Sequence, residues 1–291
     1  MWPQNLPIMS NLDVLQSAVQ STEIDDRILT TTLIANILSI VSGIFSLVVT
    51  VYTENYKKPH GRMVLDLSIL NLIYNTLNIL LFMEIATEPI CQILSFFSLF
   101  GYYSSIFYTC CFADTYYRNI KVSLFDNTNR YLRRYIIAST MLGIALAAVG
   151  ILMKVNDIEE PERLCRCSEA DLNFTNYGIP ALLSVVFCAV CFISSFSEAL
   201  ERKSVPGMEL LFYPIILIIA CLPIIVVGLY YGLTKVSYVS FNVGSLEMLL
   251  LNGQAFLNGF VQIYHLVSWR AEKRLISGDS FVKSSLLSAQ L

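Results

Sequence analysis

Charged residues are scarce in this chain of 291 residues. Lys, Arg, Asp and Glu together make up 14% of it, and hydrophobic residues make up 55%, whereas an average soluble domain has about 25% charged residues. So few charges cannot coat the surface of a soluble protein of this size, which excludes an ordinary cytosolic enzyme, a disordered chain and a secreted disulfide scaffold. The net charge is −3 and no basic face or tail stands out, so nothing points to nucleic acid.

Lys and Arg are missing from seven long apolar runs of the chain. A helix that crosses the hydrocarbon core of a bilayer needs about 20 mostly apolar residues, and each run is about that long or longer. The predicted spans are residues 28–53, 63–83, 90–117, 135–153, 178–197, 210–233 and 242–267. The sequence therefore predicts an all-α, seven-transmembrane helix bundle over 28–267. It is flanked by a tail of residues 1–27 and by a tail of residues 268–291 that contains a short amphipathic helix.

Basic residues are distributed unevenly between the two sides of this bundle. If the amino terminus lies outside, the inner segments hold 14 Lys and Arg and the outer segments hold 5. Positively charged residues favour the cytoplasmic side of membrane proteins. We therefore expect the amino terminus outside, the carboxyl terminus inside, and a multi-pass protein of the plasma membrane.

Three cysteines and one glycosylation sequon fall on the outer side in this orientation. Cys91 begins the third span, and Cys165 and Cys167 lie in the loop of residues 154–177. Because the outer face is oxidising, a disulfide from Cys91 to Cys165 or to Cys167 is expected, and the sequence does not choose between them. Asn173 opens the sequon Asn-Phe-Thr in the same loop. The cysteines within the spans are interpreted as packing residues.

Histidine is rare, and lysine is absent from the last span. The two histidines, His60 and His265, lie far apart in the sequence, and a metal hydrolase needs a cluster of His, Asp or Glu ligands. A retinal Schiff base needs a lysine in the last span, which residues 242–267 lack. We therefore expect neither an intramembrane enzyme nor a retinal protein, and no cofactor.

Polar side chains recur at helical spacing in two of the predicted spans. They are Ser68, Asn71, Asn75 and Asn78 in the second span, and Glu247, Gln254, Asn258, Gln262 and His265 in the seventh. A spacing of three or four residues places each set on one helical face, and polar groups in a membrane tend to face the bundle interior. Two interpretations stay open: hydrogen bonds that only hold helices together, or a network that rearranges between two packings.

Three acidic residues within the spans are further candidates for a functional role. Glu247 lies near the outer end of the seventh span, where it either contacts a ligand or extends its carboxylate to the interface. Asp66 lies near the inner end of the second span and is expected to pair with a basic residue of the inner loops. Asp114 and Arg118 are four residues apart, which suits an ion pair on one helical face. That pair is either a surface pair or part of an inner contact that opens on activation.

The sixth span contains Pro214 and Pro223. Proline inside a helix removes a backbone hydrogen bond and kinks the helix. In membrane helices such kinks are tolerated. The prolines predict either a hinge or a static bend in the sixth span.

Five motifs occur in the right order and in the right spans for one family. They are Arg62-Met63-Val64-Leu65-Asp66-Leu67-Ser68-Ile69-Leu70-Asn71-Leu72, Ser104 to Tyr116, Asn176-Tyr177-Gly178-Ile179-Pro180, Phe212-Tyr213-Pro214 with Ala220-Cys221-Leu222-Pro223, and Gly253-Gln254-Ala255-Phe256-Leu257-Asn258-Gly259. With them the chain resembles G-protein-coupled receptors of the cyclic-AMP-receptor-like group of slime moulds and other protists. It departs from the family where Asn71 replaces Asp, and it has no Asp-Arg-Tyr triplet.

The resemblance implies a receptor that senses an extracellular ligand and activates a heterotrimeric G protein. The Gα subunit would dock in an inner cleft between the third, fifth and sixth helices, bordered by Arg118 and by Lys121, Arg130, Arg133 and Arg134. Candidate ligand contacts are Glu247, Tyr102 and Gln254, and candidate switch residues are Asn71, Asn75, Asp114, Arg118, Pro223 and Asn258. The outer segments are acidic, which is a poor match for an anionic nucleotide.

A transporter or channel is the alternative interpretation. The polar faces of the second and seventh spans would then line a path across the membrane. Many transporters are built from repeated halves with broken helices at the midplane, and no such repeat is evident in this sequence.

Overall fold

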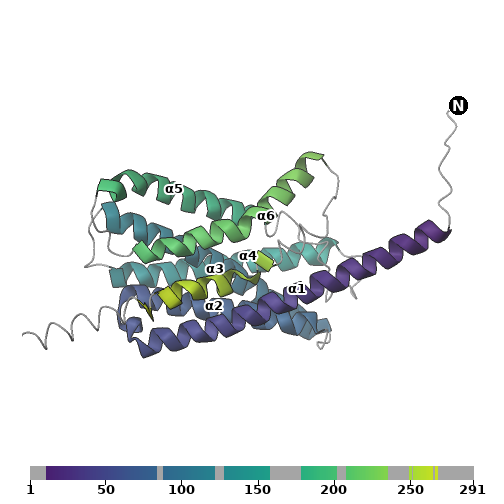
Figure 1. The fold of residues 1–291 in the computed structure, drawn as a ribbon, viewed down its shortest axis with the longest axis horizontal. Helices are drawn as coiled ribbons and strands as arrows, with labels where there is room; N and C mark the ends of the chain where they lie inside the picture. Colours follow the sequence, from purple (N-terminus) through teal and green to yellow (C-terminus); the bar gives the residue numbers. More distant parts are fainter. Residues whose placement is uncertain are drawn as a thin grey trace, which may run out of the picture.

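The computed structural model describes residues 11–83, 88–121, 128–157, 178–201, 208–234, 249–250, 252–264 and 266–267. Within these ranges every regular element is helical, as predicted. The first four long helices are α1 (Asn11–Tyr52), α2 (Pro59–Phe82), α3 (Glu88–Lys121) and α4 (Thr128–Asp157), with a short 3₁₀ turn, η1 (Asn55–Lys57), between α1 and α2. They form a bundle with roughly aligned axes (Figure 1).

The second half of the chain adds α5 (Ile179–Glu201), the 3₁₀ turn η5 (Met208–Leu211) and α6 (Phe212–Thr234). The described residues between 249 and 267, here called the seventh segment, are helical over 254–264. Among the described residues, four stretches are long and apolar enough to cross a membrane, namely Thr30–Tyr52, Pro59–Leu81, Ile90–Ile120 and Tyr131–Leu152. α5 and α6 contribute the shorter apolar stretches Ile179–Ser195 and Phe212–Val226. The protein is thus all-α, and its helices are compatible with a membrane-embedded bundle.

The connection between α1 and α2 is tight. Glu54 adopts a left-handed backbone conformation with φ of 56°, and Pro59 occupies the first turn of α2, where its missing N–H leaves no hydrogen bond unmade. A Cβ on Gly61 would lie 1.9 Å from the carbonyl oxygen of Asn55. Only glycine permits this approach of α2 to η1, which fixes the direction in which α2 leaves the turn.

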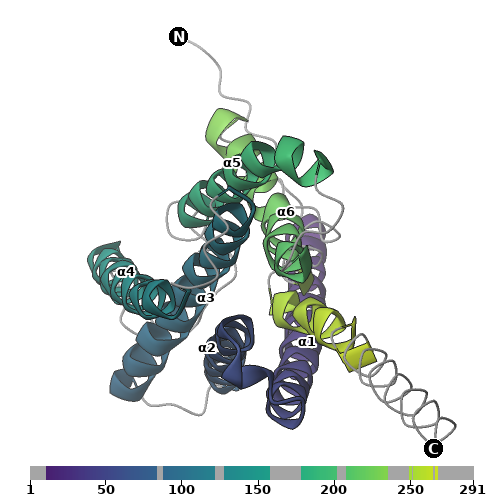
Figure 2. The same ribbon diagram turned by 90° about the vertical axis from the view of Figure 1, so that its left-hand side faces the viewer.

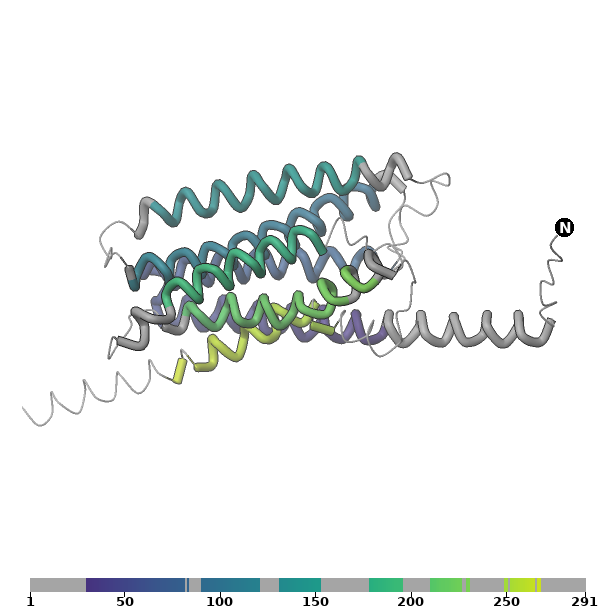
Figure 3. Tube along the Cα trace, turned by 90° about the horizontal axis from the view of Figure 1, so that it is seen from above, coloured from purple at the N-terminus to yellow at the C-terminus, as the bar shows by residue number. Residues whose placement is uncertain are grey.

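α3 is the central helix of the bundle, and α4 lies at its edge. Over their most apolar stretches 56% of α3 is buried but only 22% of α4. Figure 2 shows α4 on one side of α3, with α6 and the seventh segment on the other side, and Figure 3 places α4 at the opposite edge of the bundle from the seventh segment. The buried aromatic side chains of α3, Tyr102, Tyr103, Tyr108 and Phe112, fill the middle of the bundle.

Large apolar side chains cover the outside of α4. Its exposed residues include Ile136, Ile137, Met141, Leu142, Ile144, Val149 and Leu152. A soluble protein rarely exposes so large a continuous apolar surface. This surface is what a helix in contact with lipid presents.

Two details differ from the sequence predictions. α1 begins at Asn11, well before the predicted start of the first span at residue 28, because no helix-breaking residue separates the two. Pro214 does not kink α6, since it lies in the first turn of a helix that begins at Phe212, where its backbone nitrogen has no intrahelical acceptor to lose. Pro223 does lie inside α6.

Candidate functional site

α1 presents a buried polar face to the seventh segment. Its members recur at three- and four-residue spacing and are Thr32, Asn36, Ser39, Ser42 and Ser46. The Ser39 hydroxyl donates to the carbonyl oxygen of Asn252 at 2.6 Å, and the Ser42 hydroxyl donates to that of Ala255 at 3.2 Å. The two hydroxyls therefore supply hydrogen bonds to backbone carbonyls of the seventh segment where no water is at hand.

Asn252 joins three helices at the same level. Its Oδ1 accepts a hydrogen bond from the Tyr74 hydroxyl at 2.8 Å and another from the Asn78 amide at 3.2 Å. The Asn78 Oδ1 in turn accepts from the Ser98 hydroxyl of α3 at 2.7 Å. A continuous polar chain thus runs from α3 through α2 to the seventh segment.

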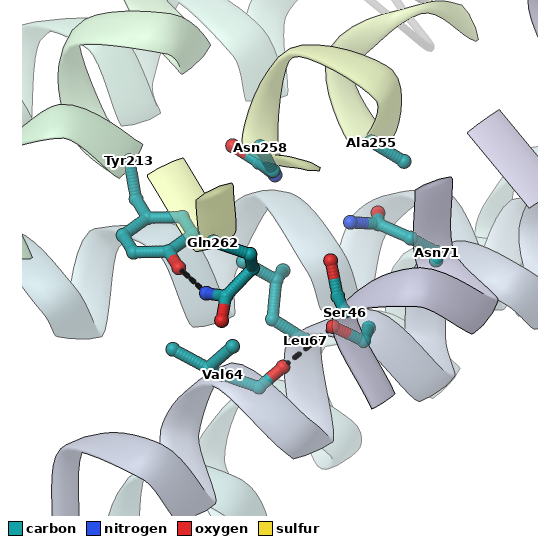
Figure 4. Close-up of a pocket in the computed structure, with 10 residues that line it drawn as sticks. Ser46, Val64, Leu67, Asn71, Tyr213, Ala255, Asn258 and Gln262 are labelled. Atoms are coloured by element: carbon teal, nitrogen blue, oxygen red, sulfur yellow. Dashed lines mark hydrogen bonds between the residues drawn. The ribbon is translucent and has the colours of Figure 1, made fainter. Parts of the chain in front are cut away.

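A small pocket lies between α1, α2, α6 and the seventh segment (Figure 4). Polar side chains from all four lie around it, among them Ser46, Asn71, Tyr213 and Asn258. The space open to the centre of a water molecule is about 10 Å³, which is close to the least that one water needs. The pocket has room for about one water and none for an organic ligand.

Asn258 is the least satisfied polar group at this pocket. It is 6% exposed, and within the described part of the chain neither its amide nitrogen nor its amide oxygen has a hydrogen-bond partner. An unpaired buried amide costs about 1–3 kcal/mol. A water in the pocket, or another arrangement of the helices, would supply the partners that Asn258 lacks.

Two side-chain contacts join the start of α6 to the seventh segment in the described part of the chain: a hydrogen bond and the edge-to-face contact of the Phe212 and Tyr264 rings, whose centroids are 6.1 Å apart. The Gln262 amide nitrogen donates to the Tyr213 hydroxyl, and both side chains are buried. The Tyr213 ring also stacks on Phe112 of α3, with ring centroids 4.6 Å apart. Tyr213 thus connects α6 to α3 and to the seventh segment, on the portion of α6 that precedes Pro223.

Asp114 forms the predicted ion pair with Arg118, and it also reaches α4. The Arg118 Nε donates to the Asp114 carboxylate at 2.7 Å, and the Tyr135 hydroxyl of α4 donates to the same carboxylate oxygen. The side chain of Asp114 is 17% exposed and that of Arg118 is 41% exposed. The pair is more than a surface contact, because it ties α3 to α4 near the ends of both helices.

Asp114→Asn should lower the melting temperature of the purified protein. The substitution removes the ion pair and weakens the acceptor of the Tyr135 hydroxyl, at a cost of about 1–2 kcal/mol for a half-exposed pair of this kind. The matched control is Glu54→Gln, which removes the exposed pair with Lys57. That contact raises the pKa of Lys57 through its hydrogen bond, but both side chains are exposed, and we expect no change in melting temperature. Equal losses in both variants would contradict the structural role of Asp114.

Asp66 has a neutral partner that the sequence did not indicate. Its carboxylate accepts a hydrogen bond from the Tyr108 hydroxyl of α3 at 2.9 Å. Arg62, from the first predicted inner segment, lies close enough to attract it electrostatically, but within the described residues the two form no ion pair. The sequence did not indicate the contact with Tyr108, because this tyrosine is one of many aromatic residues in the third predicted span and nothing marks it as a partner of Asp66.

The cysteines within the helices are packing residues, as predicted. Cys110 and Cys188 bring α3 and α5 together with their sulfur atoms 3.9 Å apart, and Cys188, Cys191 and Cys221 are buried in the same apolar cluster. Across the residues that the structure describes, no group of three or more His, Cys, Asp or Glu side chains is arranged to hold a metal ion.

The polar faces predicted for the second and seventh spans do point inward. Ser68, Asn71 and Asn75 of α2 and Gln254, Asn258 and Gln262 of the seventh segment are all buried. Tyr102 is buried in α3 with its ring 5.6 Å from that of Tyr74. Cys91 is buried at the beginning of α3.

Several predicted residues cannot be placed. Cys165, Cys167, Asn173, Glu247 and His265 lie outside the described residues. Lys121 and Arg130 belong to described helices, but only their backbone is described. Arg133 and Arg134 are exposed on α4.

Two functional groups were missed at the sequence level, the polar face of α1 and Asn252. The sequence analysis assigned the α1 residues only to an apolar span, although their spacing of three and four residues indicates one polar face. The sequence matches no protein-family model and no curated protein. The function must therefore be argued from the chemistry of the chain itself.

Proposed function

We propose that this protein is a seven-transmembrane receptor that senses an extracellular ligand and activates a heterotrimeric G protein. The observation that carries the proposal is the hydrogen bond between Tyr213 and Gln262, which lies beside the Asn258 amide, a group without a protein partner among the described residues. A hydrogen bond between the start of α6 and the seventh segment, next to a buried amide without a protein partner in the described residues, is suited to two alternative packings of α6.

The proposed topology places seven spans across the plasma membrane with the amino terminus outside. It rests on the excess of Lys and Arg in the segments assigned to the inside, 14 against 5. In this orientation the start of α6, the end of α3 and the start of α4 lie on the inner side. The Tyr213–Gln262 contact and the Asp114–Arg118 pair then both lie in the inner half of the bundle.

In the proposed mechanism the portion of α6 before Pro223 moves away from the seventh segment. Pro223 removes one backbone hydrogen bond in the middle of α6, so the helix bends there at least cost. Loss of the Tyr213–Gln262 contact frees the start of α6, and a cleft opens between α3, α5 and α6 for the Gα subunit. A ligand favours this packing only if it binds it more tightly than the closed one.

The ligand is proposed to enter from the outer side, with Glu247, Tyr102 and Gln254 as candidate contacts. Gln254 is buried and its amide nitrogen has no hydrogen-bond partner. This unpaired donor supports a polar ligand contact at Gln254. No cofactor is required by this mechanism.

A transporter remains the second candidate, and the pocket geometry argues against it. A path lined by the polar faces of α2 and the seventh segment would run through the pocket of Figure 4. That pocket accommodates about one water, and the Tyr213–Gln262 hydrogen bond at its edge joins α6 to the seventh segment. The discriminating experiment is reconstitution of the purified protein in liposomes with a panel of Gα subunits. Faster GTP exchange than with empty liposomes supports a receptor, and no acceleration by the folded protein supports the transporter.

The outer disulfide gives an independent test of the proposed topology. Cys91 is expected to pair with Cys165 or Cys167, and loss of a native disulfide costs about 2–5 kcal/mol. A reducing agent should therefore lower the melting temperature of the native protein, and Cys91→Ser should abolish that sensitivity. Cys221→Ser is the control, because Cys221 lies buried within α6 and should leave the response to reductant unchanged. A native protein that is indifferent to reductant would contradict the disulfide.

A further inference from the structure

Two arginines and a tyrosine ring form a cluster where α4 begins. The guanidinium carbon of Arg118 lies 5.0 Å from the centroid of the Tyr131 ring, and that of Arg134 lies 5.9 Å from the same centroid. A cation within about 6 Å of an aromatic ring is attracted by the ring's quadrupole. Tyr131 therefore gathers two positive charges that would otherwise repel each other.

The charges of this cluster are only partly balanced. Asp114 neutralises Arg118. Neither Arg133 nor Arg134 forms an ion pair with any side chain in the described part of the chain, and both are exposed. Two uncompensated guanidinium groups thus lie side by side in the sequence at the end of the bundle.

The surroundings of these arginines are apolar and face outward. Ile136, Ile137 and Met141 follow on the same helix and are exposed, so the arginines lie where the lipid-facing surface of α4 starts. α4 is on the far side of α3 from α6 (Figure 2). Arg133 and Arg134 are exposed at the beginning of α4, where its apolar outer surface starts.

We infer that the beginning of α4 binds the headgroup of an anionic phospholipid of the inner leaflet. Guanidinium groups bind phosphate oxygens through two parallel hydrogen bonds, and basic clusters at the cytoplasmic ends of membrane helices bind anionic headgroups. The Tyr131 ring restrains Arg134, which reduces the conformational entropy lost on binding. The acyl chains lie along the apolar face of α4. The inference goes beyond the proposed receptor function and shares with it only the orientation of the bundle.

The test measures lipid binding to the purified full chain by native mass spectrometry. The probe is phosphatidylinositol bisphosphate, and phosphatidylcholine is the reference lipid. Each basic residue near an anionic surface adds about a fivefold gain in binding, so Arg133→Gln with Arg134→Gln should weaken binding of the probe roughly 20- to 30-fold. Arg134→Lys keeps the charge but loses the planar guanidinium group that binds phosphate through two hydrogen bonds. Its affinity for the probe should lie between those of the native protein and the double variant.

The matched control is Lys57→Gln with Lys58→Gln, which removes the same charge from the exposed turn between α1 and α2, on the same proposed side. We expect less than a threefold loss there. Equal losses in the two double variants would overturn the site in favour of diffuse attraction, and so would a probe that binds no better than phosphatidylcholine. If soluble inositol trisphosphate binds as tightly as the lipid, the acyl chains contribute nothing, which would contradict the claim that the ligand is a membrane lipid. No G protein is present in this assay, so its outcome is independent of whether the protein activates one.

Discussion

Tyr213→Phe should raise the basal rate of GTP exchange by Gα about three- to tenfold. The substitution removes the hydroxyl that accepts from Gln262 and leaves the ring stacked on Phe112. A hydrogen bond between membrane helices contributes about 0.6–2 kcal/mol, and 1.4 kcal/mol is a tenfold change in an equilibrium constant. Because the contact is proposed to exist only in the closed packing, its loss should raise the ratio of open to closed protein by the same factor.

A double-mutant cycle separates this contact from other effects of the substitution. Gln262→Leu should raise the basal rate by a similar factor, and the double variant should add little to either single one, because both changes remove the same bond. Tyr264→Phe is the control, because it removes a hydroxyl from an exposed residue of the same seventh segment and keeps the ring that contacts Phe212 of α6. Additive effects of Tyr213→Phe and Gln262→Leu would show that the two residues act separately and would contradict the proposed contact.

Gly61→Ala should produce a large loss of stability. A Cβ at this position would lie 1.9 Å from the Asn55 carbonyl oxygen and 2.2 Å from its carbonyl carbon, so the backbone of the turn must move. Overpacking of this kind costs about 1–3 kcal/mol and sometimes more. The measurement is the melting temperature of the purified variant.

Gly150→Ala is the matched comparison and should raise the melting temperature. Gly150 is also a buried helical glycine, but the nearest atom to its added Cβ is Leu99 Cδ1 at 3.4 Å, an ordinary contact. Replacing a helical glycine by alanine then stabilises by about 0.5–1 kcal/mol. A gain from Gly61→Ala, or a loss from Gly150→Ala as large as that from Gly61→Ala, would contradict the packing described for these helices.

The features of the fold that could be predicted are those marked by residues that recur at helical spacing within one segment. The inward faces of α2 and of the seventh segment follow from polar residues three and four apart, and the Asp114–Arg118 pair follows from its spacing of four. Pairings between helices could not be predicted in this way. Ser39 and Asn252 are 213 positions apart in the chain, and no local pattern in either segment indicates the other.

One prediction is wrong and another is incomplete. Pro214 does not bend the sixth span, because proline in a first turn removes no hydrogen bond. Asp66 is attracted by Arg62, but nothing in the sequence indicated that it accepts a hydrogen bond from a tyrosine of the neighbouring helix. Where a helix begins and which faces meet depend on the packing of the whole bundle, which no local pattern shows.

The most direct test of the proposed function needs no ligand. The protein is tagged at its carboxyl terminus, isolated from native membranes after mild crosslinking, and examined for Gα. A parallel sample receives a non-hydrolysable GTP analogue before crosslinking. A receptor should retain Gα in the first sample and lose it in the second, because nucleotide binding releases Gα from an activated receptor. A well-folded protein that never retains Gα, or retains it equally with the analogue, would contradict the proposed function.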